Sequence, residues 1–266
     1  MNSSITGNRA NRAGGGIEVN AGSGTISLTN TNLDNNNAGV APAVAAPGSG
    51  GGLHISGMQD ITISGGTSNG NIAANEGGGL WNGSGVMTVT DHTVNGNTAS
   101  GNDMTTPGAA GGGGIYNEGG TVDLLGTTAI SNNVADGAQS TGGGILNAAG
   151  TLTANGISIT NNTSNRAGGG IETNGGGAVT LTNVNLDSND TGVVTGAGAP
   201  GNGGGMHVSG NSTINITGGT VSMNTAASEG GGLWNGTGIM TVDGTTIDGN
   251  TASGNTATEG GGGIFA

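Results

Sequence analysis

The chain has 266 residues, of which 64 are glycine, four are proline and none is cysteine, and its formal net charge is −13. This charge would repel the phosphates of a nucleic acid, and without cysteine there are no disulfides and no thiolate metal sites. No apolar run approaches the length of a membrane span, and the first residues, MNSSITGNRANR, lack the apolar core of a signal peptide.

A glycine content this high indicates disorder unless it recurs with a period, in which case it indicates a repeat architecture. Here three glycines precede an aliphatic residue nine times, at Ile17, Leu53, Leu80, Ile115, Ile145, Ile171, Met206, Leu233 and Ile264. A second motif, usually aliphatic-x-x-Asn, ends at Asn8, Asn36, Asn71, Asn97, Asn133, Asn162, Asn189, Asn224 and Asn250. Each aliphatic residue lies 17 to 19 residues before the next motif asparagine, whereas the return connection varies from 9 to 18 residues. Constant units joined by variable loops are typical of a solenoid.

Within each unit, we expect three short strands in chain order. The first follows the glycine triplet. The second is an alternation of apolar and polar residues, as at 25–29, 61–64 and 87–90, and the third precedes the motif asparagine, as at 128–130 and 157–159. Alternation with β-branched residues predicts strands whose apolar side chains face inward. The sequence therefore predicts an all-β fold, a parallel β-helix of about nine three-strand coils with no helical cap. The motif asparagines should stack as an amide ladder.

The sequence also contains a repeat that is longer than one coil. The segment NRAGGGIE occurs at residues 11–18 and again at 165–172, and EGGGLWNG occurs at 76–83 and 229–236. The offset of about five coils predicts a first block at residues 1–154 and a second, incomplete block at 155–266 that continues the first.

The pairing of GGG[ILM] with [ILV]xxN resembles the GGA[IL] and FxxN repeats of polymorphic outer-membrane proteins. More widely, it is similar to bacterial right-handed β-helix surface proteins, and the resemblance covers almost the whole chain. The chain departs from the repeat pattern by using glycine for alanine and an aliphatic residue for phenylalanine, and it shows no C-terminal membrane barrel. The resemblance implies a right-handed β-helix, secreted or at the cell surface, with an adhesive or structural role. It supplies no catalytic residue.

The residues that follow the nine aliphatic positions form one column, called here the stripe. The stripe comprises Glu18, His54, Trp81, Tyr116, Leu146, Glu172, His207, Trp234 and Phe265, and it includes every tryptophan, tyrosine and phenylalanine of the chain. If the preceding aliphatic residue faces the core, these side chains should face outward. Three interpretations remain open: stacking between coils or cover by the loops at 37–50, 98–111 and 190–202; a protein contact, lateral or with a partner; and a platform for sugars.

Polysaccharide-cleaving β-helices need paired carboxylates, or carboxylates with a metal and a basic group. The acidic residues here are scattered over many coils. Asp187 and Asp190 lie close together, but Asp34 and Asn37 occupy the matching positions of the first block. We therefore predict no enzyme activity and no catalytic or cofactor-binding residue.

Glu18 with His54, and Glu172 with His207, should be neighbours on adjacent coils. Two ligands make a weak metal site, so we expect ion pairs and predict no metal ligand. The excess of acidic residues is compatible with calcium binding, although the calcium-binding repeat pattern GGxGxDxUx is absent.

The outward positions of the second strand admit an ice-binding face. They include Thr62, Thr88, Thr90, Thr180, Thr182 and Thr241. The array is interrupted by Asp123, Leu125, Asn215 and Asp243.

The sequence opens in a third-strand segment and stops after a first-strand segment, and neither carries a capping element. Open ends of a β-helix present unpaired backbone groups. We therefore expect a non-enzymatic extracellular structural or adhesive β-solenoid that assembles end to end into a filament or forms part of a longer surface rod. The alternative is a carbohydrate-binding or polysaccharide-cleaving module that contacts glycans or a neighbouring cell surface.

Overall fold

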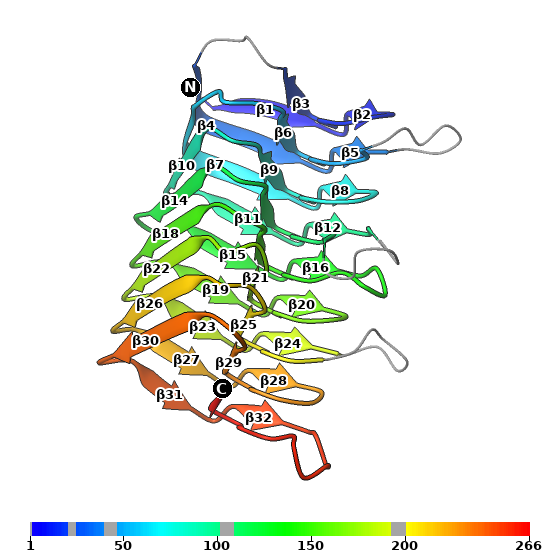
Figure 1. The fold of residues 1–266 in the computed structure, drawn as a ribbon. Helices are drawn as coiled ribbons and strands as arrows, with labels where there is room; N and C mark the ends of the chain where they lie inside the picture. Colours follow the sequence, from blue (N-terminus) through cyan, green and yellow to red (C-terminus); the bar gives the residue numbers. More distant parts are fainter. Residues whose placement is uncertain (1, 21–24, 40–46, 102–108, 193–200) are drawn as a thin grey trace.

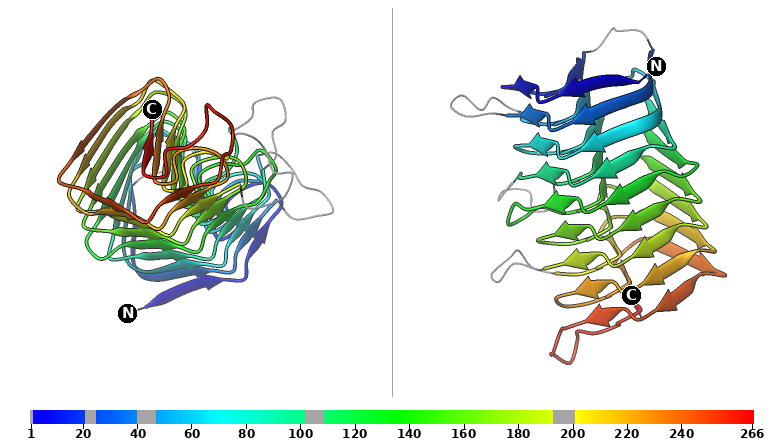
Figure 2. Two further views of the ribbon diagram at one scale, coloured as in Figure 1. Left: turned by 90° about the horizontal axis from the view of Figure 1, so that it is seen from below. Right: turned by 180° about the vertical axis from the view of Figure 1, so that it is seen from behind.

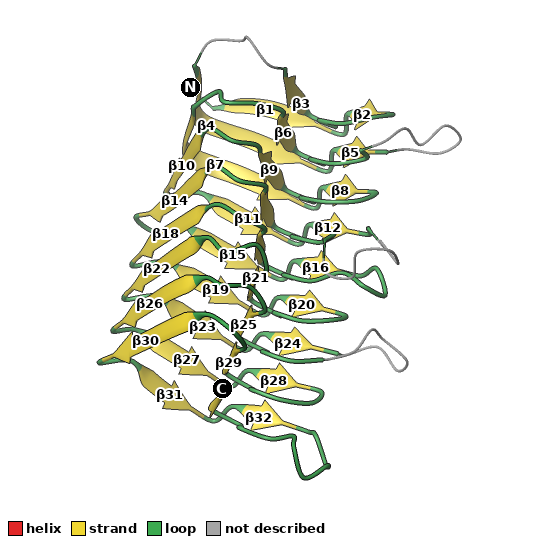
Figure 3. Cartoon of the chain, viewed as in Figure 1, coloured by secondary structure: helices red, strands yellow, loops and turns green. Residues whose placement is uncertain are grey.

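The structure, a computed structural model, describes residues 2–20, 25–39, 47–101, 109–192 and 201–266. Its strands pair in parallel and stack coil upon coil along one axis (Figure 1), and the coils superpose with a gradual rotation when seen along that axis (Figure 2). Every regular element in the described residues is a strand (Figure 3), so none of them forms a helix that could cross a membrane. The prediction of an all-β, right-handed parallel β-helix is confirmed.

Three sheets run the length of the stack, and each takes the same part of successive coils. Sheet 1 consists of β3 (Ile17–Val19), β6 (Leu53–Ile55), β9 (Leu80–Asn82), β13 (Ile115–Asn117), β17 (Ile145–Asn147), β21 (Ile171–Thr173), β25 (Met206–Val208), β29 (Leu233–Asn235) and β33 (Ile264–Phe265). The first half of sheet 2 consists of β4 (Ile26–Asp34), β7 (Ile61–Asn69), β10 (Val86–Thr90), β14 (Thr121–Leu125), β18 (Thr151–Asn155), β22 (Ala178–Thr182), β26 (Thr213–Thr217) and β30 (Ile239–Asp243).

The second half of sheet 2 consists of β1 (Ser3–Thr6), β11 (Thr93–Asn95), β15 (Ala129–Ser131), β19 (Ser158–Thr160), β23 (Asn185–Asp187), β27 (Thr220–Ser222) and β31 (Thr246–Asp248), together with the later residues of β4 and β7. Sheet 3 consists of β2 (Arg9–Ala10), β5 (Asn37–Ala38), β8 (Ile72–Ala73), β12 (Thr98–Ala99), β16 (Val134–Ala135), β20 (Thr163–Ser164), β24 (Asp190–Thr191), β28 (Thr225–Ala226) and β32 (Thr251–Ala252).

The strand composition of a coil is richer than the sequence predicted. The second and third predicted strands belong to one sheet, because β4 and β7 run unbroken through both halves of sheet 2. The two-residue strands of sheet 3 follow each motif asparagine and were not predicted, since two residues are too few to show an alternation.

Inward-facing side chains of the sheet segments fill the core of every coil, with two from each strand of the first half of sheet 2, such as Met87 and Val89 of β10. In the coil that begins at β9, Leu80, Met87, Val89 and Val94 are all fully buried. Their neighbours in the next coil are in register, as Leu80 with Ile115 and Val94 with Ile130. The core is therefore a set of aliphatic columns along the axis, which the alternation predicted.

The glycine triplet is required by the backbone geometry between sheets 3 and 1. Its first glycine has a positive φ, between 60° and 68°, in all nine copies, a conformation that side chains with a Cβ rarely adopt. A Cβ on Gly78, a second glycine, would lie 2.4 Å from the carbonyl oxygen of Gly113 in the next coil. A Cβ on Gly79, a third glycine, would lie 3.1 Å from the amide nitrogen of Asn97. The triplet therefore provides the bend, the close approach of coils and the space for the asparagine.

The motif asparagines form an unbroken amide ladder from Asn8 to Asn250. Each Nδ2 donates to the Oδ1 of the asparagine in the next coil, at 2.9 to 3.1 Å. At Asn133, Oδ1 also accepts the backbone N–H of Asn97, and Nδ2 also donates to the carbonyl of Val94. The two donors and two acceptor positions of the buried amide are therefore all used.

The bend that turns each ladder asparagine into the core lies one residue earlier. That residue has a positive φ, between 54° and 67°, in all nine coils. It is glycine at four of these positions, asparagine at Asn35, Asn132 and Asn161, serine at Ser188 and methionine at Met223. Glycine and asparagine adopt a positive φ most readily. The residue before each ladder asparagine is therefore part of the repeated motif.

A second, shorter ladder was missed by the sequence analysis. Asn82 donates to Asn117 at 2.9 Å and Asn117 to Asn147 at 2.7 Å, on the last residues of β9, β13 and β17. The Oδ1 of Asn82 has no hydrogen-bond partner, because Ile55 occupies its place in the preceding coil. An asparagine two residues after the aliphatic position, in three successive copies, was the available signal.

We predict that Asn133→Ala lowers the free energy of unfolding by roughly 3–5 kcal/mol. The change leaves buried donors on Asn97 and the acceptor at Val94 without these partners, whereas Asn162 Oδ1 keeps the backbone N–H of residue 133. Each unpaired group costs about 1–3 kcal/mol. The measurement is the urea dependence of circular dichroism.

The matched control is Asn155→Ala, because Asn155 is exposed on β18 and exposed substitutions change stability by about 0.5 kcal/mol or less. Equal effects of the two substitutions would contradict a stabilising role for the ladder.

Candidate functional site

The stripe lies along sheet 1, with one residue in register in each coil. Most of its side chains are not exposed. The buried members are His54, Trp81, Tyr116, Leu146, Glu172 and His207. The remaining three, Glu18, Trp234 and Phe265, are partly buried. Trp81, Tyr116 and Leu146 pack in a cluster separate from the coil core, so the stripe faces away from the core as expected. Most of it is nevertheless covered, which fits the interpretation of stacking or cover, and both faces of sheet 1 are packed.

Segments that flank the strands of sheet 1 form a trough over the first coils of the stripe. A hollow of ≈ 430 Å³ remains over the first coils, with His54 and Trp81 among its walls. Pro47 and Glu76 line it from the segments before the strands, whereas Ser84 and others line it from the segments after them. Residues 40–46, 102–108 and 193–200, the middle of the three loops predicted to cover the stripe, lie outside the described residues.

Aromatic rings of the stripe stack on one another along the axis. The ring centroids of His54 and Trp81 are 4.2 Å apart, and those of Trp81 and Tyr116 are 5.7 Å apart with an interplanar angle of 8°. In the second block, His207 stacks on Trp234 at 4.2 Å and Trp234 stacks on Phe265 at 6.3 Å. Such pairs stabilise by about 0.5–1.5 kcal/mol beyond area burial. The interpretation of stacking between coils thus describes the observed contacts.

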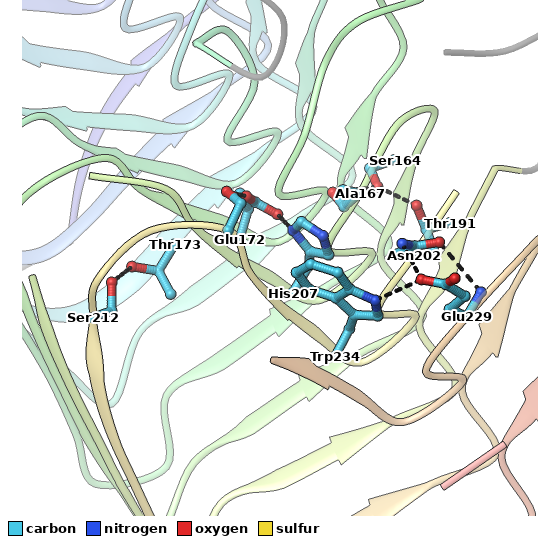
Figure 4. Close-up of polar contacts among 11 residues, drawn as sticks. Ser164, Ala167, Glu172, Thr173, Thr191, Asn202, His207, Ser212, Glu229 and Trp234 are labelled. Carbon is cyan, nitrogen blue, oxygen red and sulfur yellow. Dashed lines mark hydrogen bonds and ion pairs between the residues drawn. The ribbon is translucent and has the colours of Figure 1, made fainter. Parts of the chain in front are cut away.

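A glutamate–histidine pair begins the stripe in each block. His207 Nδ1 lies 2.7 Å from Glu172 Oε2 (Figure 4). The hydroxyl of Ser209 donates to Glu172 Oε1 at 2.9 Å. His54 Nδ1 lies 3.1 Å from Glu18 Oε2, without hydrogen-bond alignment. The predicted neighbours are therefore in contact, and Glu172, beneath Leu146, is fully buried.

The indole N–H groups of the two tryptophans have equivalent partners. Trp234 Nε1 donates to Glu229 at 2.8 Å, and Trp81 Nε1 donates to Glu76 at 3.2 Å. Asn202 also donates to Glu229, at 2.8 Å (Figure 4). Each EGGGLWNG phrase therefore carries its own hydrogen bond, from the tryptophan back to the glutamate across the glycine bend.

Burial shifts the pKa of several groups near the stripe. It lowers the pKa of the His54 imidazole to about 4, and the Arg12 guanidinium acts in the same direction. Burial raises the pKa of the Glu18 carboxyl, which Arg12 opposes. Burial also raises the pKa of the Tyr116 phenol, as do the charges of Glu76 and Glu118. These groups favour their uncharged forms, as a packed interior requires.

His92, which carried no functional prediction, is a buried corner residue in sheet 2. Its Nε2 lies 2.9 Å from the hydroxyl of Ser68, and its Nδ1 lies 2.8 Å from the carbonyl oxygen of Gly65. Burial lowers the pKa of this imidazole, which the hydrogen bond to Gly65 and the charge of Asp34 oppose. Both ring nitrogens are satisfied within the chain, so His92 is structural.

The carboxylates considered for catalysis are held by neighbouring backbone and hydroxyl groups. Asp187 accepts from the hydroxyl of Thr220 and the backbone N–H of Ser222. Its equivalent Asp34 accepts in the same way from Thr67 and Asn69. Burial raises the pKa of Asp190 on β24. The repeated geometry of Asp34 and Asp187 indicates a turn-stabilising role.

The residues of the stripe offer little for binding a metal ion or a sugar. Within the described residues, no three His, Cys, Asp or Glu side chains group in a way that could hold a metal ion. Trp81 has His54 against one face and Tyr116 against the other, so neither face is free for a sugar ring. Trp234 is enclosed in the same way by His207 and Phe265. The stripe is suited to connecting coils.

Protein-family models, curated proteins and solved structures offer no match to this chain.

We predict that Trp81 is less accessible to a soluble quencher than Trp234. Trp81 is 6% exposed, whereas Trp234 is only partly buried. The single-tryptophan variants Trp234→Phe and Trp81→Phe allow each emission to be measured with acrylamide. A steeper quenching of Trp81 than of Trp234 would contradict the packing of sheet 1.

We predict that stability falls as the pH decreases from 7.5 to 5. His92 has a folded-state pKa below its ordinary value of 6.5, so the unfolded chain binds the proton first and the stability present above pH 6.5 is lost below it. His54 acts in the same direction down to about pH 4. One such group contributes at most about 1.4 kcal/mol per pH unit.

The substitution His92→Gln should reduce this pH dependence when thermal unfolding is followed at pH 7.5, 6.5, 5.75 and 5. Arg9→Gln, at an exposed position on β2, is the control and should leave the slope unchanged. An unaltered slope in His92→Gln would show that His92 does not titrate with unfolding.

Proposed function

We propose that this protein is a non-enzymatic extracellular β-solenoid, secreted or at the cell surface, that serves as a structural or adhesive rod. The observation that supports this proposal most is that its buried polar residues form contacts between successive coils, along the axis of the stack. The asparagine ladder and the glutamate–histidine–tryptophan contacts all join one coil to the next. Glutamate and histidine, which build catalytic sites in many enzymes, here connect neighbouring coils along the axis.

The ladder has a direction that allows continuation. Asn8 Nδ2 donates into the stack, and at that end no described residue donates to its Oδ1. Asn250 accepts from Asn224 through Oδ1, and no described residue accepts its backbone N–H at the other end. A further coil, from a second copy or from a longer chain, would extend the same chain of amides.

The terminal coils also leave apolar side chains incompletely covered. The core residues with partial cover at the two ends are Ile5, Ile17, Ile26, Leu28, Met240, Val242 and Ile247. Ile264 on β33 is 45% exposed. Covering this surface is favourable by about 25 cal/mol per Å², which supports end-to-end continuation. Lateral contact through the stripe is not proposed, because most of the stripe is buried.

A second candidate function is carbohydrate binding in the trough over the first coils. Arg12, Glu76 and Glu118 line that hollow, and the second block has Arg166 and Glu229 at the positions equivalent to the first two. These polar groups favour a hydrogen-bonded saccharide over ring stacking. Saturable glycan binding that Arg12→Ala abolishes would favour this candidate over the structural rod.

We predict that the protein associates end to end with increasing concentration. Nine coils give a unit of about 40 Å at a spacing near 4.8 Å, so negative-stain micrographs should show rods in multiples of this length. Sedimentation velocity should show a rising average mass. Ile264→Asp should reduce the association, because it places a charge on the open core at the end of the stack.

Met223→Asp is the matched control, because Met223 is 62% exposed but lies in a lateral turn before Asn224. It should leave the association unchanged. A single species of monomer mass at every concentration would rule out end-to-end assembly of this chain, and equal effects of the two substitutions would place the contact on the side of the rod.

A further inference from the structure

We propose that the outward face of the first half of sheet 2 binds ice. The face carries two columns of side chains, called here the hydroxyl face. One column is Ser27, Thr62, Thr88, Asp123, Thr153, Thr180, Asn215 and Thr241. The other is Thr29, Ser64, Thr90, Leu125, Asn155, Thr182, Thr217 and Asp243. This function is independent of end-to-end assembly.

The hydroxyl face is a regular two-dimensional array. Its strands lie side by side down the stack (Figure 1), and Thr62 pairs in register with Thr88, as Ser64 does with Thr90. Neighbouring coils are spaced by about 4.8 Å, and alternate residues of one strand by about 6.6 Å. Hydroxyl and methyl groups therefore repeat in two directions over a surface that the ladder and core keep rigid.

The hydroxyls of this face make no hydrogen bonds within the part of the chain that the structure describes. Among the described residues, no serine or threonine side chain of the two columns has a hydrogen-bond partner, and none is fully buried. On the adjacent half of sheet 2 the situation differs, because Thr67 donates to Asp34 at 2.9 Å and Thr220 donates to Asp187 at 2.8 Å. The face thus presents free hydroxyls to water, each fixed by its strand.

These features favour ordered water over a dissolved ligand. The face holds no arginine, lysine or aromatic residue: the three arginines lie at positions 9, 12 and 166, and all Trp, Tyr and Phe residues lie in the stripe. Each hydroxyl contact with water is weak, but many contacts that repeat with a crystal add together. A preorganised array has already lost its conformational freedom on folding, so binding costs less entropy.

Asp123 and Leu125 divide the hydroxyl face in the middle. Thr88 and Thr90 pair with them directly, so the hydroxyls of β4, β7 and β10 are separated from those of β18 and the later strands. A carboxylate holds its own hydration shell and a leucine offers no hydroxyl. This division allows a test in which ice-binding activity should increase. The double substitution Asp123→Thr with Leu125→Thr would join the hydroxyls on the two sides of β14 into one array.

The experiment measures thermal hysteresis and ice-crystal shape by nanolitre osmometry. The unmodified chain should shape ice crystals, and D123T/L125T should raise the hysteresis by about two-fold or more, because more contacts act together. Thr88→Tyr should lower it by at least half by lifting the face from a flat crystal. The matched control Thr163→Tyr, outward on sheet 3, should retain full activity. Circular dichroism and sedimentation verify that each variant keeps its fold and association state.

Absence of ice shaping in both the unmodified chain and D123T/L125T would overturn the proposal, even if Thr88→Tyr failed to fold. Equal losses in Thr88→Tyr and Thr163→Tyr would also overturn it, because the effect would not belong to this face. Retention on crystalline cellulose or chitin, lost in Thr88→Tyr and without any ice shaping, would assign the face to a solid glycan instead. None of these outcomes bears on whether the protein forms rods.

Discussion

The hydrogen bond from one asparagine amide to the next is the constraint on which the other features of the coil depend. The amide packs against the third glycine of the triplet: a Cβ on Gly79 would lie 3.1 Å from Nδ2 of Asn97 and 2.6 Å from the carbonyl oxygen of Gly114 in the next coil. The amide faces inward only because the residue before it has a positive φ. The triplet, the bend and the asparagine therefore form one structural unit, repeated nine times, and loops vary only where none of the three is affected.

The stripe shows how an apparently functional pattern can serve packing. Tryptophans repeated at one position on an outward-facing column suggested an interface. The structure places them between a histidine and a second ring, with the indole N–H bonded to a nearby glutamate. The second block repeats the ring stacking and the indole hydrogen bond of the first, although only its glutamate–histidine pair is aligned as a hydrogen bond. Repetition of a residue thus reflected repetition of its neighbours.

Polar side chains with hydroxyl and amide groups have different roles in the interior of the coil and on the outer face of sheet 2. Inside the coil, the ladder amides and several hydroxyls are hydrogen-bonded, as Thr173 is with Ser212 and Ser164 with Thr191. On the first half of sheet 2, the threonines of the hydroxyl face point outward and have no hydrogen-bond partner among the described residues. A rigid interior with an ordered, unsatisfied exterior is the physical basis for the two proposals, a rod and a surface that contacts an ordered solid.

The sequence by itself determined the fold, because coil length, strand alternation and the two motifs repeat often enough to fix the register of every coil. It also identified the ladder asparagines and the glutamate–histidine neighbours, since residues at equal positions in a parallel stack must lie one above another. Only the tertiary structure decided that Trp81 and its neighbours are buried, because alternation separates the two sides of a strand but does not reveal what packs against each side. The two-residue strands of sheet 3 and the ladder at Asn82 likewise required coordinates, since their signals span too few residues to show a period.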